Sequence, residues 1–309
     1  MLWLPSNVKA LCKLYVVFLI FIASRVAQAT PATFVTALPV ATNQILARFN
    51  WNATFSSQDL TRFQWPFNIA YGLTARWTLF STLTLQHESL TEQTAQMPRQ
   101  LSSGGWGDTL LFARYTIYSH DTPNSTFRIA PLAGMYLPSG SNTLQTSNGL
   151  LPAPLQTGSG TVAPYAGIAT GWNSTAYGFA ADSTMRHNPI TSSGISPGDE
   201  FRADAQGELR LWPLKLPRYG VPRELWISIE ENYQHDSLTH IERAIVPGSG
   251  GISFHQDAIL EYATLHYEIA AGMQFPVVQD LNSASDVREK QQFIFFTEYY
   301  LSGFRGRKK

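Results

Sequence analysis

Seven histidines are the residues of this chain best suited to metal binding or acid–base chemistry. They stand at positions 87, 120, 187, 235, 240, 255 and 266. No two have the His-x-x-x-His spacing of a metal-binding helix, and the sole cysteine, Cys12, lies near the N-terminus. His235, Asp236, His240 and Glu242 are close enough in sequence for a metal or acid–base cluster. Because they fall in or beside a polar stretch, we expect a solvated loop there, with no metal and no cofactor.

Motifs for covalent catalysis and phosphate binding are missing from the sequence. The Gly-x-Ser-x-Gly nucleophile motif does not occur, and its nearest fragment is Gly158-Ser159-Gly160. The glycine-rich segments 104–105 and 248–251 lack the lysine and the helix of a phosphate loop. The sequence therefore predicts no catalytic residue, and we expect that the protein is not an enzyme.

Alternation of polar and apolar residues predicts that β-strands position the ionisable side chains. From Glu200 to Trp212, one parity reads Phe, Ala, Ala, Gly, Leu, Leu, and the other reads Glu, Arg, Asp, Gln, Glu, Arg. Residues two apart share a face of a strand, so one face is apolar and the other is ionisable. Segment 76–88 repeats the pattern with Phe80 as an apolar exception on its polar side. A soluble sheet with one wet face would give the same alternation in a single strand.

Composition distinguishes a membrane barrel from a soluble sheet. Charged residues make up 14%, against about 25% in soluble domains, and aromatic residues make up 13%. No apolar run after residue 29 approaches the ~18 residues of a membrane-spanning helix. Several strands begin or end with Trp, Tyr or Phe, as expected where rings sit at a membrane–water boundary. These features predict an all-β protein, a transmembrane antiparallel up-and-down β-barrel.

The first 29 residues read as a cleaved signal peptide. Lys9 and Lys13 precede the apolar run 14–23, and Ala27-Gln28-Ala29 is the small-x-small pattern of a cleavage site. Cleavage would leave 19 basic against 22 acidic residues from the original 22 of each, which argues against nucleic-acid binding. We expect export through the secretory pathway to the outer membrane of a Gram-negative cell. The predicted divisions are 1–29 signal peptide, 30–42 periplasmic segment, 43–304 barrel and 305–309 basic tail.

Twelve strands are expected, joined alternately by short periplasmic turns and longer external loops. The last strand ends in Phe304, an aromatic residue of the kind that barrel-assembly machinery reads, and the lipid bilayer and lipopolysaccharide are the expected surroundings. The predicted strands are 43–54, 61–71, 75–88, 107–119, 125–138, 160–173, 175–187, 198–212, 223–236, 253–263, 266–277 and 289–304.

The polar parity of these strands supplies the candidate lumen-lining residues. Charges of both signs inside a narrow barrel either pair across the lumen as a structural network or select polar solutes, and alternating opposite charges along the same strands favour the network. The candidates are Arg48, Arg76, Arg114, Arg128, Asp182, Arg186, Glu200, Arg202, Asp204, Glu208, Arg210, Glu230, Glu268 and Glu298.

A series of short motifs between residues 45 and 277 resembles a known family. The motifs are Tyr71-Gly72-Leu73-Thr74, Gly104-Gly105-Trp106-Gly107-Asp108, Leu137-Pro138-Ser139-Gly140, Gly158-Ser159-Gly160 and Asp199-Glu200-Phe201-Arg202. In their order and spacing the chain resembles the outer-membrane transporter-like proteins named for the MetA pathway of phenol degradation. That resemblance implies an outer-membrane barrel that passes small, often hydrophobic or aromatic, molecules, and it carries over no substrate residues.

Two functions remain open from the sequence. The first is a transporter or channel for an unknown small solute. The second is a closed structural or surface-binding barrel whose external loops contact partners. A lipid-acting enzyme would need an outward His and Ser together on adjacent strands, but His87 and Ser81 lie too far apart along one strand.

Overall fold

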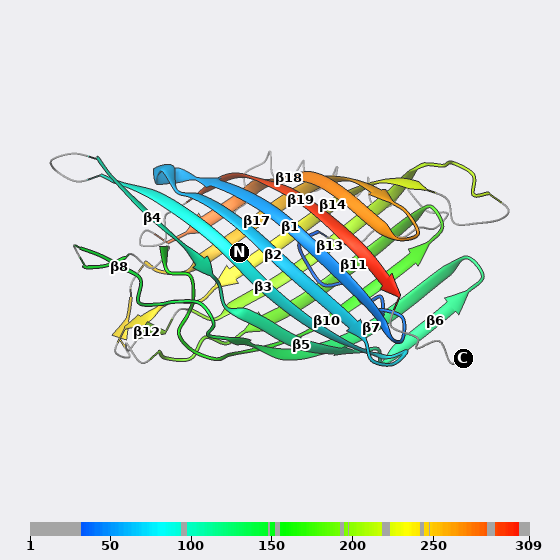
Figure 1. Cartoon of the computed structure of the whole chain (residues 1–309), viewed down its shortest axis with the longest axis horizontal. Helices are drawn as coiled ribbons and strands as arrows, with labels where there is room; N and C mark the ends of the chain where they lie inside the picture. Colours follow the sequence, from blue (N-terminus) through cyan, green and yellow to red (C-terminus); the bar gives the residue numbers. More distant parts are fainter. Residues whose placement is uncertain are drawn as a thin grey trace, which may run out of the picture.

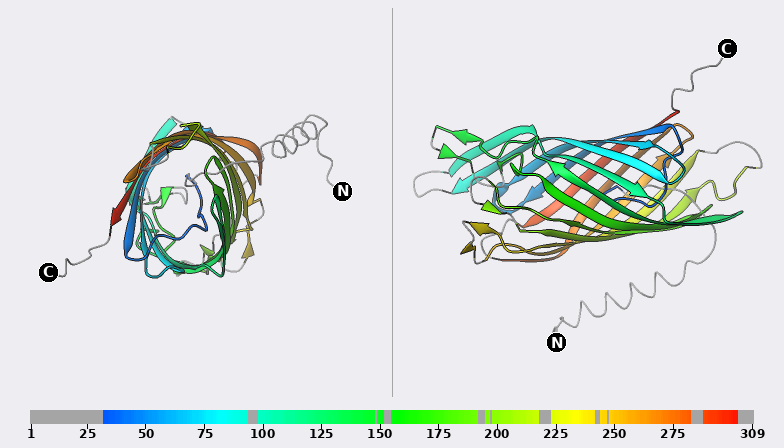
Figure 2. Two further views of the ribbon diagram at one scale, coloured as in Figure 1. Left: turned by 90° about the vertical axis from the view of Figure 1, so that its right-hand side faces the viewer. Right: turned by 90° about the horizontal axis from the view of Figure 1, so that it is seen from below.

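The computed structural model describes residues 32–302, apart from 94–97, 148, 152–154, 192–194, 197, 218–222, 242–243, 247 and 283–287. In this part of the chain, twelve antiparallel strands close into one barrel, because β19 pairs with β1 and β7 pairs with β10 (Figures 1 and 2). The predicted fold class is confirmed. The predicted signal peptide and the C-terminal tail lie outside the described residues. The barrel strands are β1 (Gln44–Ser56), β2 (Thr61–Gly72), β3 (Trp77–Gln93), β5 (Thr109–Tyr115), β7 (Ser125–Leu137), β10 (Ala163–Ser174), β11 (Tyr177–Arg186), β13 (Glu200–Trp212), β14 (Glu224–Asp236), β17 (Gly251–Ala263), β18 (Tyr267–Leu281) and β19 (Glu289–Ser302).

The alternation in the sequence separates an apolar outer surface from a polar interior. Along β13, Phe201 and Leu211 are exposed on the outside, whereas Asp204, Glu208 and Arg210 are buried inside. The same division holds around the barrel, so that its outer wall is a belt of exposed apolar side chains. Members of this belt are Phe49, Phe67, Leu79, Leu111, Met135, Ile168, Phe179, Ile229, Leu260, Ile269 and Phe295. Among the described residues, no helix has the length and apolar character required to cross a membrane.

Connections at the two ends of the barrel differ in length (Figure 1). At one end lie the turns after β2, β10 and β17, with the longer 213–223 connection. The other end carries a short 3-10 helix and the additional strands of the loops. These are η1 (Ser57–Asp59), β4 (Pro98–Trp106), β8 (Gln145–Thr146), β9 (Gly149–Leu150), β12 (Ile195–Ser196), β15 (His240–Ile241) and β16 (Ala244–Ile245).

The predicted strand 107–119 is interrupted in the structure. β3 is longer than expected. Its first part, Trp77 to Thr82, pairs with β5, and its later part, Leu85 to Gln93, pairs with β4. Residues 107–108 lie between β4 and β5, and β6 (Tyr118–Thr122) forms a separate hairpin with β7. The break within 107–119 lies at residues 116–117, whereas the gap between β4 and β5 holds Asp108, whose side chain accepts hydrogen bonds from Gly140 and Ser159 of the loops.

Residues 32–43, here called the N-terminal segment, lie inside the barrel and not in the periplasm as expected (blue in Figure 2, left). The segment runs from mid-lumen to the end that carries the short turns, where Asn43 donates its N–H to the Gly72 carbonyl at 2.7 Å. A side chain at Gly72 would not fit, because a Cβ there would lie 2.1 Å from the Ala41 oxygen. The segment has no charged residue, so the sequence offers no local sign of the polar partners that hold it.

Candidate functional site

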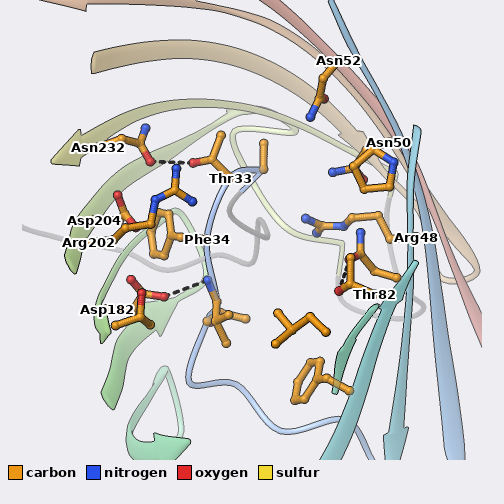
Figure 3. A pocket seen from close by; sticks show the side chains of 18 of the residues that line it. Thr33, Phe34, Arg48, Asn50, Asn52, Thr82, Asp182, Arg202, Asp204 and Asn232 are labelled. Atoms are coloured by element: carbon orange, nitrogen blue, oxygen red, sulfur yellow. Dashed lines mark hydrogen bonds between the residues drawn. The ribbon is translucent and has the colours of Figure 1, made fainter. Parts of the chain in front are cut away.

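A cavity of about 700 Å³ lies inside the barrel between the N-terminal segment and the strands. Its walls come from β1, β2 and β3 on one side and from β11, β13 and β14 on the other (Figure 3). This volume falls in the range of sites that enclose small organic molecules. The cavity is therefore the candidate functional site.

Backbone hydrogen bonds to two buried carboxylates hold the first half of the N-terminal segment. Glu230 accepts the Ala32 N–H at 2.6 Å, the Thr33 N–H at 3.3 Å and the Thr33 hydroxyl at 2.5 Å. Three residues further on, Val35 donates its N–H to Asp182 at 3.0 Å. These carboxylates satisfy donors that an irregular segment cannot pair with itself.

The second half of the segment is held by Arg114. Its guanidinium donates to the carbonyl oxygens of Thr36 and Leu38 and lies 4.9 Å from the centre of the Phe80 ring. Between these anchors, Ala37 is fully buried against apolar side chains of the wall. The segment is thus fixed by donors, acceptors and packing from β5, β7, β10, β11 and β14.

Aromatic residues form one part of the cavity wall. The rings of Phe80 and Phe112 stack at 4.5 Å with an angle of 3° between their planes. Tyr165 contacts Phe112 edge-on at 5.8 Å and Tyr136 at 5.7 Å. Phe80, the exception to the alternation of its strand, therefore belongs to an apolar patch inside the lumen.

Amide and hydroxyl side chains form another part of the wall. Asn50, Asn52, Asn68 and Thr82 all line the cavity from β1, β2 and β3. Thr82 donates to the Asn68 oxygen at 2.7 Å, while the buried amide oxygens of Asn50 and Asn52 accept no hydrogen bond from the described residues. The cavity thus offers both aromatic contact and polar acceptors to a molecule inside it.

Ion pairs form along the cavity wall, both between strands and within one strand. Arg48 on β1 contacts Glu298 on β19 at 2.6 Å. On β13, Arg202 lies 3.4 Å from Glu200 and donates to Gln234 at 3.2 Å. Each guanidinium is matched to a local acceptor, as expected for a polar network inside a narrow barrel.

The structure divides the fourteen sequence candidates into several groups. Seven of them line the cavity: Arg48, Arg114, Asp182, Glu200, Arg202, Asp204 and Glu298. Glu208, Glu230 and Glu268 are buried without lining it. Arg128, Arg186 and Arg210 contact Asp121, Asp108 and Glu224 respectively, also away from the cavity.

Arg76 is the one candidate that the structure places outside the lumen. β3 begins at Trp77, so Arg76 belongs to the preceding turn and is exposed. Sequence reasoning also missed Asp257 and Glu261, which are buried on β17. Every second residue from His255 to Glu261 is ionisable except Ile259, and this alternation would have identified Asp257 and Glu261 as inward-facing.

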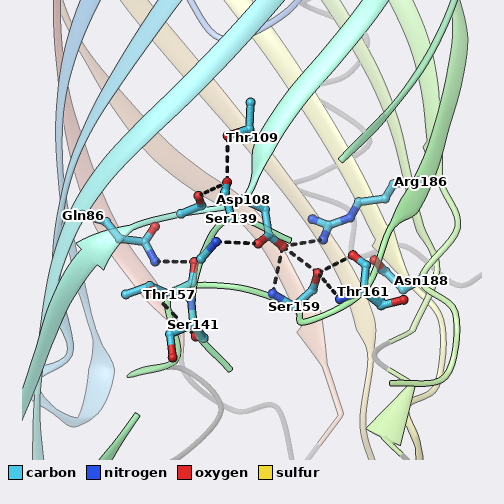
Figure 4. A network of polar contacts seen from close by, with 12 residues as sticks. Gln86, Asp108, Thr109, Ser139, Ser141, Thr157, Ser159, Thr161, Arg186 and Asn188 are labelled. Carbon is cyan, nitrogen blue, oxygen red and sulfur yellow. Dashed lines mark hydrogen bonds and ion pairs between the residues drawn. The ribbon is translucent and has the colours of Figure 1, made fainter. Parts of the chain in front are cut away.

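The glycine-rich motifs of the sequence meet in one hydrogen-bond network at the loop end of the barrel (Figure 4). Asp108 accepts the Gly140 N–H at 3.2 Å and both the N–H and the hydroxyl of Ser159, at 2.8 and 2.6 Å. Gln86 donates to the Thr157 carbonyl at 3.3 Å. The network fixes the start and the end of the loop between β7 and β10, which also buries Leu151 and Leu155.

A second loop anchor involves a histidine. Asp199 accepts the Asn188 N–H at 2.8 Å and lies 2.9 Å from His187 Nδ1. Partial burial alone would raise the pKa of the Asp199 carboxyl. The contacts with Asn188 and His187 favour the charged carboxylate more strongly, so the pKa lies below its ordinary value. Among the described residues, no group of three His, Cys, Asp or Glu side chains is placed to hold a metal ion. Glu242, part of the sequence cluster near His240, lies outside them.

Comparison with solved structures finds the same fold in the COG4313 outer membrane channel from Pseudomonas putida F1. The TM-score is 0.60 at 14% identity, over 89% of this chain and 100% of that chain. The NanC porin gives a TM-score of 0.44 at 10% identity, over 82% of this chain and 98% of that chain. The beta domain of the Bordetella autotransporter Brka gives a TM-score of 0.42 at 11% identity, over 84% of this chain and 99% of that chain. No family model and no curated protein matches the sequence. The resemblance to the MetA-pathway family therefore stays a prediction.

Proposed function

We propose that this protein is an outer-membrane channel that passes small solutes through the barrel lumen. The observation that carries the proposal is a cavity of about 700 Å³ inside a closed barrel whose outer surface is an apolar belt. A belt of this kind suits a strand barrel surrounded by lipid, because the closed sheet leaves no backbone group unpaired. Export by a cleaved signal peptide, assembly-factor recognition of the last strand and contact with lipopolysaccharide belong to the same proposal.

The N-terminal segment makes this a narrow channel. It crosses the lumen from mid-barrel to one end and contacts Glu230, Asp182 and Arg114 on the wall. A solute that passes must fit beside the segment or displace it. The function that fits this arrangement is selective passage of small molecules, rather than free diffusion through a wide pore.

Solutes with an aromatic or apolar part suit the cavity best. Phe80, Phe112 and Tyr165 offer ring faces and edges, and the facing Asn50 and Asn52 offer acceptors to a hydroxyl or amine group. Aromatic pairs contribute about 0.5–1.5 kcal/mol beyond the burial of area. The resemblance to MetA-pathway proteins, which implies passage of hydrophobic or aromatic molecules, supports the same class.

The second candidate function is a closed barrel whose loops bind a partner. The observation in its favour is that the N-terminal segment fills part of the lumen, as a structural plug would. The loop end also exposes Ile241 and Ile245 on the small strands β15 and β16.

Solute entry into liposomes tests the proposed function against this alternative. Mature protein reconstituted in liposomes is expected to admit small aromatic alcohols faster than protein-free liposomes do, with entry falling as solute size increases. Folding is checked beforehand by heat-modifiable migration in gels. Entry rates equal to those of empty liposomes, from a correctly folded barrel, would favour the closed barrel.

A further inference from the structure

Three pairs of carboxylates face each other directly across neighbouring strands inside the barrel. Asp182 on β11 is opposite Asp204 on β13, Glu230 on β14 is opposite Asp257 on β17, and Glu268 on β18 is opposite Glu298 on β19. All six residues are at most 8% exposed. Like charges in directly opposed positions destabilise a sheet, so an arrangement repeated three times requires compensation from elsewhere.

Among the described residues, only one of the three pairs includes a carboxylate that forms an ion pair. Glu298 contacts Arg48 at 2.6 Å, and its neighbour Glu268 accepts the Tyr300 hydroxyl at 3.2 Å. None of the other four carboxylates forms an ion pair with a described residue. The remaining cavity-lining guanidinium groups are engaged elsewhere: Arg62 with Glu88, Arg114 with backbone carbonyls and Arg202 with Glu200.

Uncharged N–H donors from the N-terminal segment take the place of cations at the other two pairs. Ala32 and Thr33 donate to Glu230, and Val35 donates to Asp182. The donors leave part of each pair unsatisfied, because Asp182 Oδ1, Asp204 Oδ1 and Asp257 Oδ1 are buried without a hydrogen-bond partner among the described residues.

Asp204 is the clearest case of an acceptor that faces the cavity without a donor. It lines the cavity and is 5% exposed, with the carboxyl group of Asp182 opposite it on β11 and Asn232 opposite it on β14 (Figure 3). A buried carboxylate gains most from a ligand that brings both positive charge and N–H donors.

Resting on the proposed function, we propose that the lumen selects positively charged solutes, and that the cavity-lining pair Asp182–Asp204 determines this selectivity. The preferred class is small ammonium compounds, whose N–H groups can join that of Val35 at Asp182 and supply a donor to Asp204. Glu298 of the third pair also lines the cavity, so a cation inside it meets acidic side chains from β11, β13 and β19.

Reversal potentials across planar bilayers under a KCl gradient test this inference. We expect K⁺ to permeate over Cl⁻ by a factor on the order of ten, because acidic walls of low dielectric concentrate cations. Methylammonium, which carries N–H donors, is expected to permeate better than tetramethylammonium, which has none. The Asp182→Asn/Asp204→Asn double variant is expected to lose most of the preference for K⁺.

Asp121→Asn is the matched control, because that carboxylate is 61% exposed on the β6–β7 hairpin outside the cavity. It is expected to keep the wild-type permeability ratio. If the double variant does not fold, the single Asp204→Asn replaces it. The selectivity inference alone is overturned if the wild-type channel conducts without preference for K⁺. It is also overturned if the double variant, or the Asp204→Asn variant that replaces it, keeps the wild-type preference. A folded barrel that never conducts, with or without the N-terminal segment, overturns the proposed function as well.

Discussion

The backbone N–H of Ala32 donates a 2.6 Å hydrogen bond to Glu230, a residue 198 positions later that is fully buried inside the barrel. This contact places the beginning of the N-terminal segment in mid-lumen, and Arg114 fixes its other half. The width of the proposed passage therefore depends on a segment held by a few identifiable contacts. Each contact can be removed without touching the lipid-facing surface.

Cross-linking the segment to the wall is expected to hold the channel in its narrow state. Thr33 Oγ1 lies 2.8 Å from Asn232 Oδ1, and the predicted mature chain contains no cysteine. The Thr33→Cys/Asn232→Cys variant should form a disulfide under oxidation, and its bilayer conductance should rise when the disulfide is reduced. Thr33→Cys alone is the control, and its conductance should not change when the reductant is added. Equal conductance of the oxidised and reduced double variant would show that the segment does not restrict passage.

Truncation of Arg114 should release the second half of the segment. The change leaves the Thr36 and Leu38 carbonyls without their donor, at a cost of about 1–3 kcal/mol. We expect Arg114→Ala to lower the free energy of unfolding in urea by that amount and to raise protease cleavage within residues 32–43. Arg114→Lys should recover part of both effects. Wild-type protease resistance in Arg114→Ala would contradict the anchoring role.

Removal of the stacked rings should slow the entry of aromatic solutes selectively. Phe80 and Phe112 line the cavity and stack at 4.5 Å. Phe80→Ala is expected to reduce liposome entry of an aromatic alcohol roughly two- to tenfold, corresponding to about 0.5–1.5 kcal/mol, and to spare a small aliphatic alcohol. Phe179→Ala, which changes an outward ring, is the control. Equal losses for both alcohols would mean that the patch has a structural role only.

Neutralising Asp108 should loosen the loop between β7 and β10. Its carboxylate accepts three hydrogen bonds, one from Gly140 and two from Ser159. Asp108→Asn is expected to cost about 1–3 kcal/mol locally and to increase hydrogen exchange of the Gly140 and Ser159 amides, while β13 amides stay protected. Unchanged exchange at both loop amides would remove Asp108 from its anchoring role.

Acid should weaken the β6–β7 hairpin only at low pH. Hydrogen bonds from Arg128 and Thr126 lower the pKa of Asp121 to about 2, against an ordinary value of about 3.9. Because the folded-state pKa is depressed, the contribution of Asp121 to stability is complete above the ordinary pKa and is lost as the pH falls through 2. A carboxyl titration followed by NMR should show a midpoint near 2 that rises in Arg128→Gln. A wild-type midpoint near 3.9 would exclude the Arg128 contact in solution.

The sequence predicted the barrel well because alternation is a local signal. The alternation over residues 200–212 predicts both faces of β13. The twelve predicted strands correspond to the twelve strands of the barrel. The turn chemistry also separated short connections from long ones. The gap at Asp108 was missed because a side chain that bonds to loops 32 and 51 residues away has no pattern of its own.

The candidate site was less predictable because its contacts join distant parts of the chain. Charged wall residues such as Arg48 and Asp204 followed from parity. The N-terminal segment did not, since its partners Asp182 and Glu230 lie 147 and 198 residues away from the donors they satisfy. Phe80 was visible as an exception to the alternation, but Phe112 and Tyr165 had to be brought beside it by folding.

Single-channel conductance of the mature protein, compared with a variant lacking residues 32–41, tests the central claim most directly. The channel account predicts small, discrete conductance steps for the complete protein and larger steps for the shortened one, because the segment occupies the lumen. Both proteins must first show heat-modifiable migration, which establishes that the barrel has folded. Folded barrels that remain silent in both forms would contradict the account and identify a filled, closed barrel.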